Sequence, residues 1–182
     1  MKEQLQKDFD NTIKNLSLSQ KDIEIKKFSL DNFINKGFPN RKEEDWKFSD
    51  LNQIINKNIG ELSFYNDYTS TNKVDTSVFV DGLEHNKIVF INGRIEKIDF
   101  DYEKKNQIEI IDQSETINKF NNNSSLSDLN SAFTNKSFKI VVKEGYQLTK
   151  PLIIYHTTNS KIWSKNINLR LNFELYENSS LR

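Results

Sequence analysis

"NKIVFINGRIEKIDF", residues 86–100, is the stretch at which the sequence changes from a helical to a β-type pattern. A short run of β-branched and aromatic residues ends at Asn92 and Gly93, a pair typical of two-residue hairpin turns. A second run follows through Ile95, Ile98 and Phe100, although it alternates less cleanly. The stretch therefore predicts a β-hairpin, with helices expected before it and strands after it.

The residues before the hairpin carry helical periodicity. A first helix is predicted over residues 5–16, where apolar side chains recur at steps of four, four and three: Leu5, Phe9, Ile13 and Leu16. A second helix is predicted with Ser29 as its N-cap. It should end at Gly37, because glycine suits the left-handed position after a helix and Pro39 prevents continuation.

The stretch "GFPNRKEEDWKFSDL", residues 37–51, predicts a third helix beginning near Asn40, whose spacing to Glu43 matches a capping box. Trp46 is expected to be an aromatic plug at a helix end, with its indole N–H bonded to backbone; contact with a partner protein is the alternative. A further helix is predicted from a cap at Ser49, with an apolar stripe of Leu51, Ile54 and Ile55.

Acidic residues also follow Asn40 in this stretch. The carboxylates of Glu43, Glu44 and Asp45 are consecutive, and consecutive helical residues point in different directions. We therefore expect them to stabilise a helix N-terminus rather than to act as acid–base groups.

The residues after the hairpin are mostly β-type. Residues 106–120 are ambiguous, with "IEII" strand-like and "SETINKF" helix-like, and "LSDLNSAF" (126–133) predicts an amphipathic helix. Strands are expected at "FKIVV" and "PLIIYHTT", and most clearly at "INLRLNFELY", which alternates with a period of two. The predicted organisation is a helical domain over 1–62, a mixed region with the hairpin over 63–135, and a β-rich segment over 136–182.

Composition excludes several classes of protein. Among the 182 residues, Lys+Arg and Asp+Glu number 26 each, and no basic block is present, so nucleic-acid binding is not expected. There is no cysteine, and the N-terminus lacks the apolar region of a signal peptide. No apolar run approaches the length of a membrane span. A soluble cytoplasmic protein without membrane association is therefore predicted.

Chemistry-bearing motifs are sparse. The two histidines, His85 and His156, are far apart in sequence, and a metal site needs three or four convergent ligands. The five glycines occur singly, so no phosphate-binding loop is present. We predict a protein that is not an enzyme and carries no metal or other cofactor in this chain.

Four stretches, taken in order, resemble the SufD family of the SUF iron–sulfur cluster assembly machinery. The first resembles the family's N-terminal signature at Gly37, Pro39, Arg41, Lys42, Glu44, Trp46, Lys47 and Leu51. The others are "KIVFINGR" (87–94), "LSDLNSAF" with "FKIVVKEGYQLTKPLIIYHTT" (126–158), and "NLRLNFELYENSSLR" (168–182). Arg41, Glu44 and Trp46 identify the family and are expected to be structural.

The resemblance implies an α+β protein in which a small N-terminal helical domain leads through a β-rich segment into a right-handed parallel β-helix. It also implies a non-catalytic scaffold that acts with SufB-like and SufC-like subunits. The family's cluster-associated Cys and His match no residue here. The chain ends just after a turn, so we expect the N-terminal portion of a longer protein. Without the continuation, its open strand edge is expected to form an edge-to-edge homodimer or to aggregate.

Two alternatives stay open. One is a β-helical carbohydrate-active or adhesion module, against which stand the missing signal peptide and the lack of a recognisable carboxylate pair. The other is a generic cytoplasmic protein-interaction domain.

Overall fold

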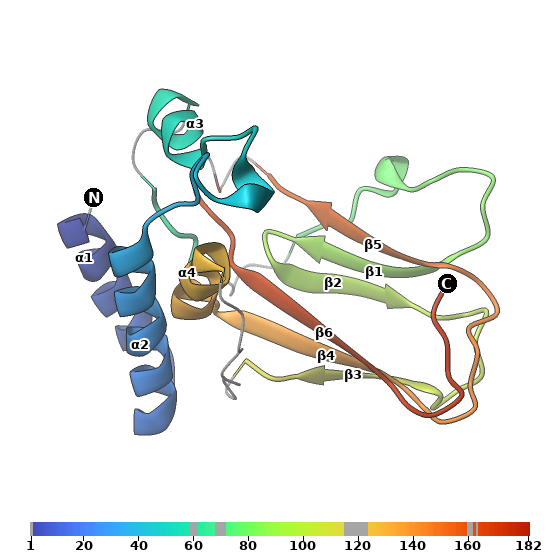
Figure 1. Ribbon diagram of the computed structural model, residues 1–182. Coiled ribbons are helices and arrows are strands. Elements are labelled where there is room, and N and C mark those ends of the chain that lie inside the picture. The colour runs from blue at the N-terminus through green and yellow to red at the C-terminus, as the bar shows by residue number, and fades with distance from the viewer. Residues whose placement is uncertain (1, 59–61, 68–71, 115–123, 160–161, 163) are drawn as a thin grey trace. The chain divides into compact units, whose positions relative to one another are not determined.

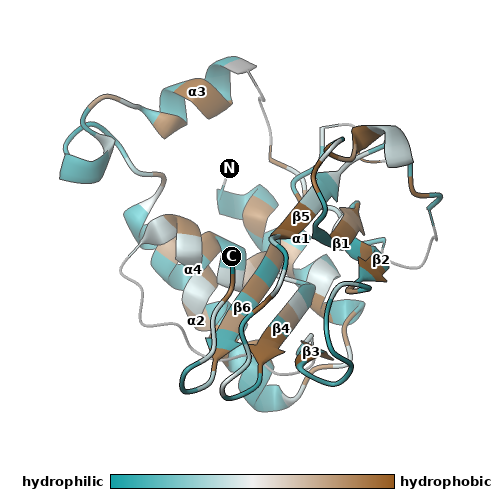
Figure 2. Ribbon diagram, turned by 90° about the vertical axis from the view of Figure 1, so that its right-hand side faces the viewer, coloured by the Kyte–Doolittle hydropathy of each residue, from teal (hydrophilic) through white to brown (hydrophobic). Residues whose placement is uncertain are grey.

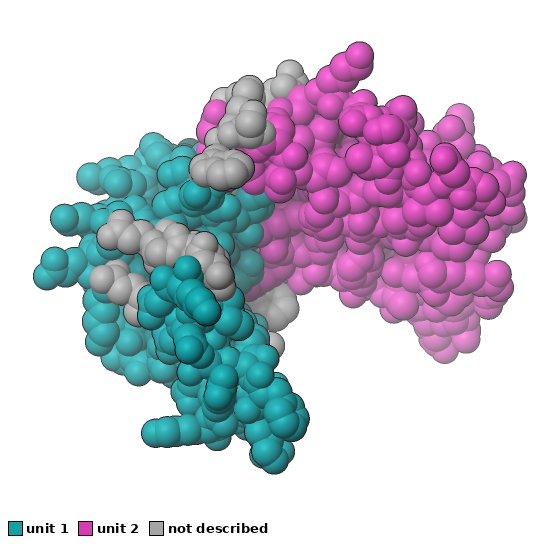
Figure 3. Space-filling model, turned by 90° about the horizontal axis from the view of Figure 1, so that it is seen from above, with its two compact units in different colours: residues 1–66, 114–135, 164–168 teal, residues 67–113, 136–163, 169–182 magenta. Residues whose placement is uncertain are grey.

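The computed structural model describes residues 2–58, 62–67, 72–114, 124–159, 162 and 164–182 (Figure 1). The chain divides into two compact units that interleave in sequence (Figure 3). Unit 1 comprises residues 1–66, 114–135 and 164–168, and unit 2 comprises residues 67–113, 136–163 and 169–182. In the described part of the chain, no helix is long and apolar enough to cross a bilayer.

Unit 1 is helical. Its elements are α1 (Lys2–Lys14), α2 (Gln20–Lys36), the 3₁₀ turn η1 (Glu44–Trp46), α3 (Leu51–Asn58) and α4 (Ser125–Phe133). Apolar side chains from all four α-helices share one core, and Phe133 of α4 contacts two other aromatic rings in it. The Phe133 ring meets Phe9 edge-on, with centroids 6.2 Å apart, and stacks on Phe64 at 3.6 Å.

The predicted start of the second helix is wrong, but its predicted end is confirmed. α2 begins at Gln20 with Ser19 as its N-cap, whose side chain accepts a hydrogen bond from the Asp22 N–H at 3.2 Å. Ser29 lies inside the helix and donates to the Ile25 carbonyl one turn earlier. At the C-terminus, Gly37 has φ +73° and its N–H donates to Phe33 O at 2.7 Å.

The helix predicted from Asn40 is also wrong. Glu43 does accept from the Asn40 N–H at 3.2 Å, as a capping box requires. The Asn40 side chain, however, accepts from the Lys42 N–H two residues on, which closes a local turn, and only η1 follows. The next helix, α3, is capped by Asp50 rather than Ser49, because the Asp50 carboxylate accepts from the Gln53 N–H at 3.0 Å.

A lysine is buried in the core of unit 1. Lys26 of α2 is 1% exposed, and its ammonium donates to backbone carbonyls at the C-terminal end of α4. The acceptors are Thr134 O at 2.6 Å and Ser131 O and Ala132 O at 3.3 Å. The last carbonyls of a helix have no partner within the helix and carry the negative end of its dipole. The ammonium therefore caps α4 from the side.

Unit 2 consists of two three-stranded sheets and the 3₁₀ turn η2 (Thr76–Val78). One sheet has the order β2-β1-β5, formed by β1 (Asn86–Ile91), β2 (Arg94–Asp99) and β5 (Leu152–Thr157). The other has the order β3-β4-β6, formed by β3 (Ile108–Asp112), β4 (Lys136–Val142) and β6 (Leu169–Leu175). Each sheet contains one antiparallel pair and one parallel pair.

The predicted hairpin is confirmed. β1 pairs antiparallel with β2, and the turn residues Asn92 and Gly93 have φ values of +52° and +80°. Positive φ at both central residues is the geometry that Asn-Gly favours. Between Val89 and Phe90 the register skips Glu96, which marks a bulge in β2 and agrees with the weaker alternation of the second run.

The predicted entry into a right-handed parallel β-helix is wrong. Two small mixed sheets take its place among the described strands, and they show no solenoid. The physical reason is that β2 and β3 each fold back antiparallel on a neighbour, whereas a parallel β-helix stacks strands of one direction. The sheets bury one shared core, centred on Ile88 and Phe90 from β1 and Phe138 and Ile140 from β4.

Candidate functional site

The candidate site is the segment from Gly37 to Lys57, because it holds the residues singled out by the sequence. Phe38 and Pro39 are buried, and the Phe38 ring meets Phe33 edge-on with centroids 5.0 Å apart. Apart from half-buried Trp46, the side chains from Arg41 to Phe48 are exposed. The segment is thus fixed at its start and presents charged side chains to solvent.

Trp46 does not occupy the place predicted for it. It ends η1 and is half-buried, and across the described residues no hydrogen bond of its indole N–H is present. Phe38 is the aromatic that fills the core beside α2, with 3% of its surface exposed. Phe48, two residues after Trp46, is 92% exposed and lies 6.0 Å from the Lys47 ammonium.

Arg41 and Glu44 are exposed, and their contacts are few. Glu44 lies 4.0 Å from the Lys47 ammonium, with the two side chains 90% and 60% exposed. A pair this open contributes little to stability. Arg41 makes no ion pair with Asp45 in the described structure, because the two residues lie in successive turns rather than in an α-helix. The fold therefore leaves both side chains available.

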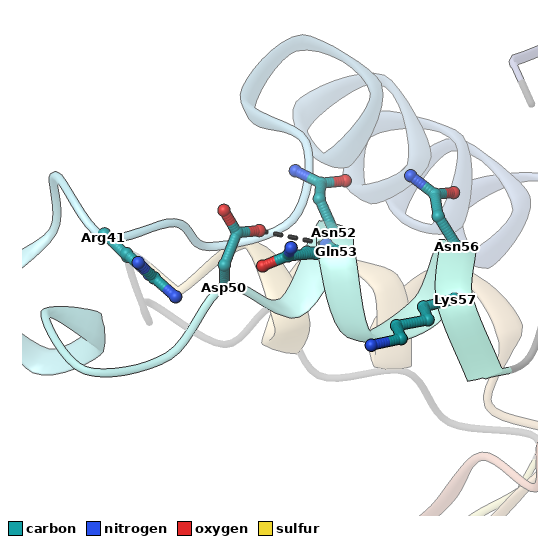
Figure 4. Close-up of a pocket in the computed structure, with 6 residues that line it drawn as sticks. All are labelled: Arg41, Asp50, Asn52, Gln53, Asn56 and Lys57. Atoms are coloured by element: carbon teal, nitrogen blue, oxygen red, sulfur yellow. Dashed lines mark hydrogen bonds between the residues drawn. The ribbon is translucent and has the colours of Figure 1, made fainter.

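An open depression lies within this segment (Figure 4). Arg41 contributes from the loop before η1, and the other lining residues come from the start and polar face of α3: Asp50, Asn52, Gln53, Asn56 and Lys57. Asp50 is already engaged in capping α3. The lining offers amide and cationic groups, which suit contact with polar or acidic groups of a partner.

The carboxylates of Glu43, Glu44 and Asp45 do not converge, as expected. Glu43 turns back to the Asn40 N–H, and Glu44 and Asp45 begin η1 with their side chains in solvent. The expected stabilisation of an α-helix N-terminus is absent, because a three-residue 3₁₀ turn takes the helix's place.

His85 belongs to a buried network in unit 2. Its Nδ1 lies 2.6 Å from Leu83 O, and because a carbonyl can only accept, Nδ1 carries the proton. Its Nε2 then accepts from the Tyr155 hydroxyl at 2.7 Å, whose oxygen accepts from the Val80 N–H at 3.0 Å. Both ring nitrogens of His85 are therefore occupied by hydrogen bonds, which connect the start of β1 and Tyr155 of β5 to the loop of residues 80–83. His156 stacks on Phe90 instead, with centroids 4.9 Å apart.

No group of three or more potential metal ligands converges among the residues that the structure describes.

Glu103, which no sequence motif indicated, is the carboxylate with the most hydrogen bonds in the described structure. It accepts from Tyr146 Oη at 2.7 Å, from Asn86 Nδ2 at 2.6 Å, and from the Thr149 and Lys150 N–H groups at 3.1 Å. Burial by itself would raise the pKa of the Glu103 carboxyl, but these donors outweigh it and lower the pKa from 4.5 to about 2. The carboxylate holds the β2–β3 and β4–β5 connections together.

We predict that Glu103 makes unit 2 acid-sensitive. Because the folded-state pKa is depressed, its contribution is present above pH 4.5 and is lost as the pH falls toward 2; solvent screening of this partly exposed group limits it to about 2 kcal/mol. Glu103→Gln should flatten the decline of unfolding free energy in this window, measured by urea unfolding with hydrogen exchange in β1 and β5. Glu144→Gln, a change at an exposed carboxylate of the β4–β5 connection, should leave the decline unchanged. Equal profiles for wild type and Glu103→Gln would contradict the assignment.

Comparison with known proteins gives no assignment, since no protein-family model matches the chain and no curated protein matches it in sequence.

Proposed function

We propose that the chain is a non-catalytic cytoplasmic scaffold subunit of the SUF iron–sulfur cluster assembly machinery, acting with SufB-like and SufC-like subunits. The proposal is supported by the ordered series of four stretches that resemble the SufD family. The cluster is the cargo of the complex, and this chain contributes contacts rather than ligands to it.

The observation that carries the proposal is the exposure of the signature residues. Arg41, Glu44 and Lys47 match the family pattern, yet they are exposed and make at most one weak ion pair. Packing therefore does not explain why these residue types occur together. With Phe48, 92% exposed, they form a docking loop, residues 41–48, in which an aromatic side chain is surrounded by charges. Exposed aromatic and arginine side chains are typical anchors of protein interfaces.

Co-purification tests the proposal. The tagged chain should capture the SufB-like and SufC-like subunits of the same organism when all three are co-expressed. The double variant Arg41→Ala/Phe48→Ser should reduce the captured amount at least tenfold while the circular dichroism spectrum and melting temperature stay unchanged. Lys105→Ala, a change at another exposed site, should capture as much as wild type.

Two outcomes would count against the proposal. If the folded wild-type chain captures neither subunit, a role in this machinery is contradicted. The alternative of a generic protein-interaction domain would then be favoured. If the double variant captures as much as wild type, residues 41–48 are not the docking surface.

A further inference from the structure

Asn92 and Gly93, the residues of the β1–β2 turn, form the one Asn-Gly pair in the sequence. The backbone nitrogen of Gly93 can attack the side-chain amide carbon of Asn92, because glycine has no Cβ to shield that nitrogen. A bond forms between Gly93 N and Asn92 Cγ, the Gly93 N–H proton passes to solvent, and ammonia leaves with Nδ2. Water then opens the succinimide ring to aspartate or isoaspartate. The net reaction consumes one water and needs no enzyme.

The folded chain holds the Asn92 amide in place. β1 and β5 are neighbouring parallel strands rich in hydrophobic residues (Figure 2), and Asn92 and Asn159 follow their ends. Asn92 Nδ2 donates to Asn159 Oδ1 at 2.9 Å, and Asn92 Oδ1 accepts from the Asn159 N–H at 3.1 Å. The Asn92 N–H donates to Thr157 O at 3.1 Å. The side chain that would have to rotate toward Gly93 N is therefore fixed at both of its polar atoms.

Burial adds to this protection. Asn92 is 2% exposed, so the water that the reaction consumes has little access to its amide. Asn159 is in turn held by Asn72, whose Oδ1 accepts from Asn159 Nδ2 at 2.8 Å. The N–H and Nδ2 of Asn72 both donate to Glu96 Oε1 of β2 at 3.1 Å. A change at one member of such a network removes a partner from the next.

An acid at position 92 does not fit this network. A carboxylate has no donor for Asn159 Oδ1 and places negative charge against it. Turning the Asn159 amide round would direct its Nδ2 to the carboxylate but would give up Asn72. Isoaspartate also lengthens the backbone of the turn by one methylene, which disturbs the two-residue geometry of the hairpin. Both products therefore oppose the closed turn.

We propose that Asn92 is a deamidation site controlled by opening of the β1–β2 turn: the closed turn protects it, and the acid formed during opening prevents unit 2 from regaining this structure. A reaction restricted to a transiently opened state proceeds in proportion to the population of that state when opening and closing are fast. Deamidation thus makes an otherwise reversible opening irreversible. The inference does not depend on a role in cluster assembly.

Peptide mapping of the full chain by mass spectrometry tests the protection. The chain is incubated at mildly alkaline pH, either folded in buffer or unfolded in guanidinium chloride, and the acid at position 92 is followed over time. The folded chain should form it at least tenfold more slowly than the unfolded chain. Asn178, which is exposed and precedes a serine, is the control in the same samples. Its rates in the two conditions should differ less than threefold.

Variants at Asn159 test the hydrogen bonds. Asn159→Ala removes the acceptor of Asn92 Nδ2 and should speed deamidation of the folded chain at least fivefold, with the rate in guanidinium chloride unchanged. Asn159→Asp keeps an acceptor oxygen there and should stay closer to wild type. Circular dichroism establishes that both variants are folded, and the comparison of folded with unfolded wild type does not depend on either.

Asn92→Asp tests the consequence of the reaction. It should shift the denaturant midpoint of unit 2, followed by hydrogen exchange in β1 and β5, to lower concentration. Asn178→Asp, the same change at the exposed turn, should leave the midpoint unchanged. Equal deamidation rates at position 92 in folded and unfolded wild type would overturn the proposal. So would an Asn92→Asp chain as stable as wild type, or a folded Asn159→Ala chain that deamidates no faster.

Discussion

Replacing Phe38 with alanine is expected to lower the free energy of unfolding of unit 1 by about 3 kcal/mol. Phe38 is 3% exposed and packs edge-on against Phe33, at the point where α2 ends and the docking loop begins. Removing the ring takes away its contacts and leaves a cavity that the fixed ends of α2 and α3 cannot fill. Urea unfolding followed by circular dichroism measures the change.

Trp46→Ala is the matched comparison, since it removes a larger aromatic side chain eight residues later. It should cost less than about 1 kcal/mol, because Trp46 is half-buried at the end of a 3₁₀ turn. If Trp46→Ala were the more destabilising of the two, Trp46 rather than Phe38 would be the anchor of this segment.

Replacing Lys26 with methionine is expected to destabilise unit 1 by about 3 kcal/mol. Methionine keeps the side-chain length and removes the cost of burying an ammonium. It also leaves the carbonyls of Ser131, Ala132 and Thr134 without the donor that caps the end of α4. The loss of three charge-assisted hydrogen bonds at a negative helix end outweighs the gain, because these carbonyls lie where water has little access.

The loss of stability in Lys26→Met should appear at the end of α4 at lower denaturant concentrations than those that unfold the whole unit. Hydrogen exchange at the amides of the last turn of α4 should accelerate in Lys26→Met at denaturant concentrations that leave α1 protected. Lys27→Met changes the adjacent, exposed lysine and should leave both exchange and stability within about 0.5 kcal/mol of wild type. A Lys26→Met protein as stable as wild type would show that the ammonium contributes no net stabilisation.

Local sequence signals predicted those features whose cause is local. The hairpin at Asn92 and Gly93 and the end of α2 at Gly37 both depend on positive φ, which the residue type alone makes favourable. The caps were harder to predict, because several residues compete for one role. Ser19 and Asp50 cap their helices where Ser29 and Ser49 were expected. Each helix begins where its apolar face first packs on the core, and the residue at that point becomes the cap.

The partners of the buried polar groups could not be predicted from the sequence. His85 and Tyr155 lie 70 positions apart, and Lys26 and the carbonyl of Thr134 lie 108 apart. Glu103 is one of many acidic residues, and only the meeting of two connections around it distinguishes it. The exposure of Arg41 and Glu44 likewise became known only from the structure.

The sequence by itself determined the helical character of α1, α3 and α4, the end of α2, the hairpin and the strand character of β6, because periodicity and turn chemistry act between near neighbours. Only the tertiary structure decided that β2 and β3 fold back antiparallel, so that two mixed sheets form instead of a parallel β-helix. Strand direction depends on which distant strands bury a common core, here Phe90 of β1 against Phe138 of β4. An alternating sequence can pair with either a parallel or an antiparallel neighbouring strand. Burial of the shared core selects the direction of the neighbour.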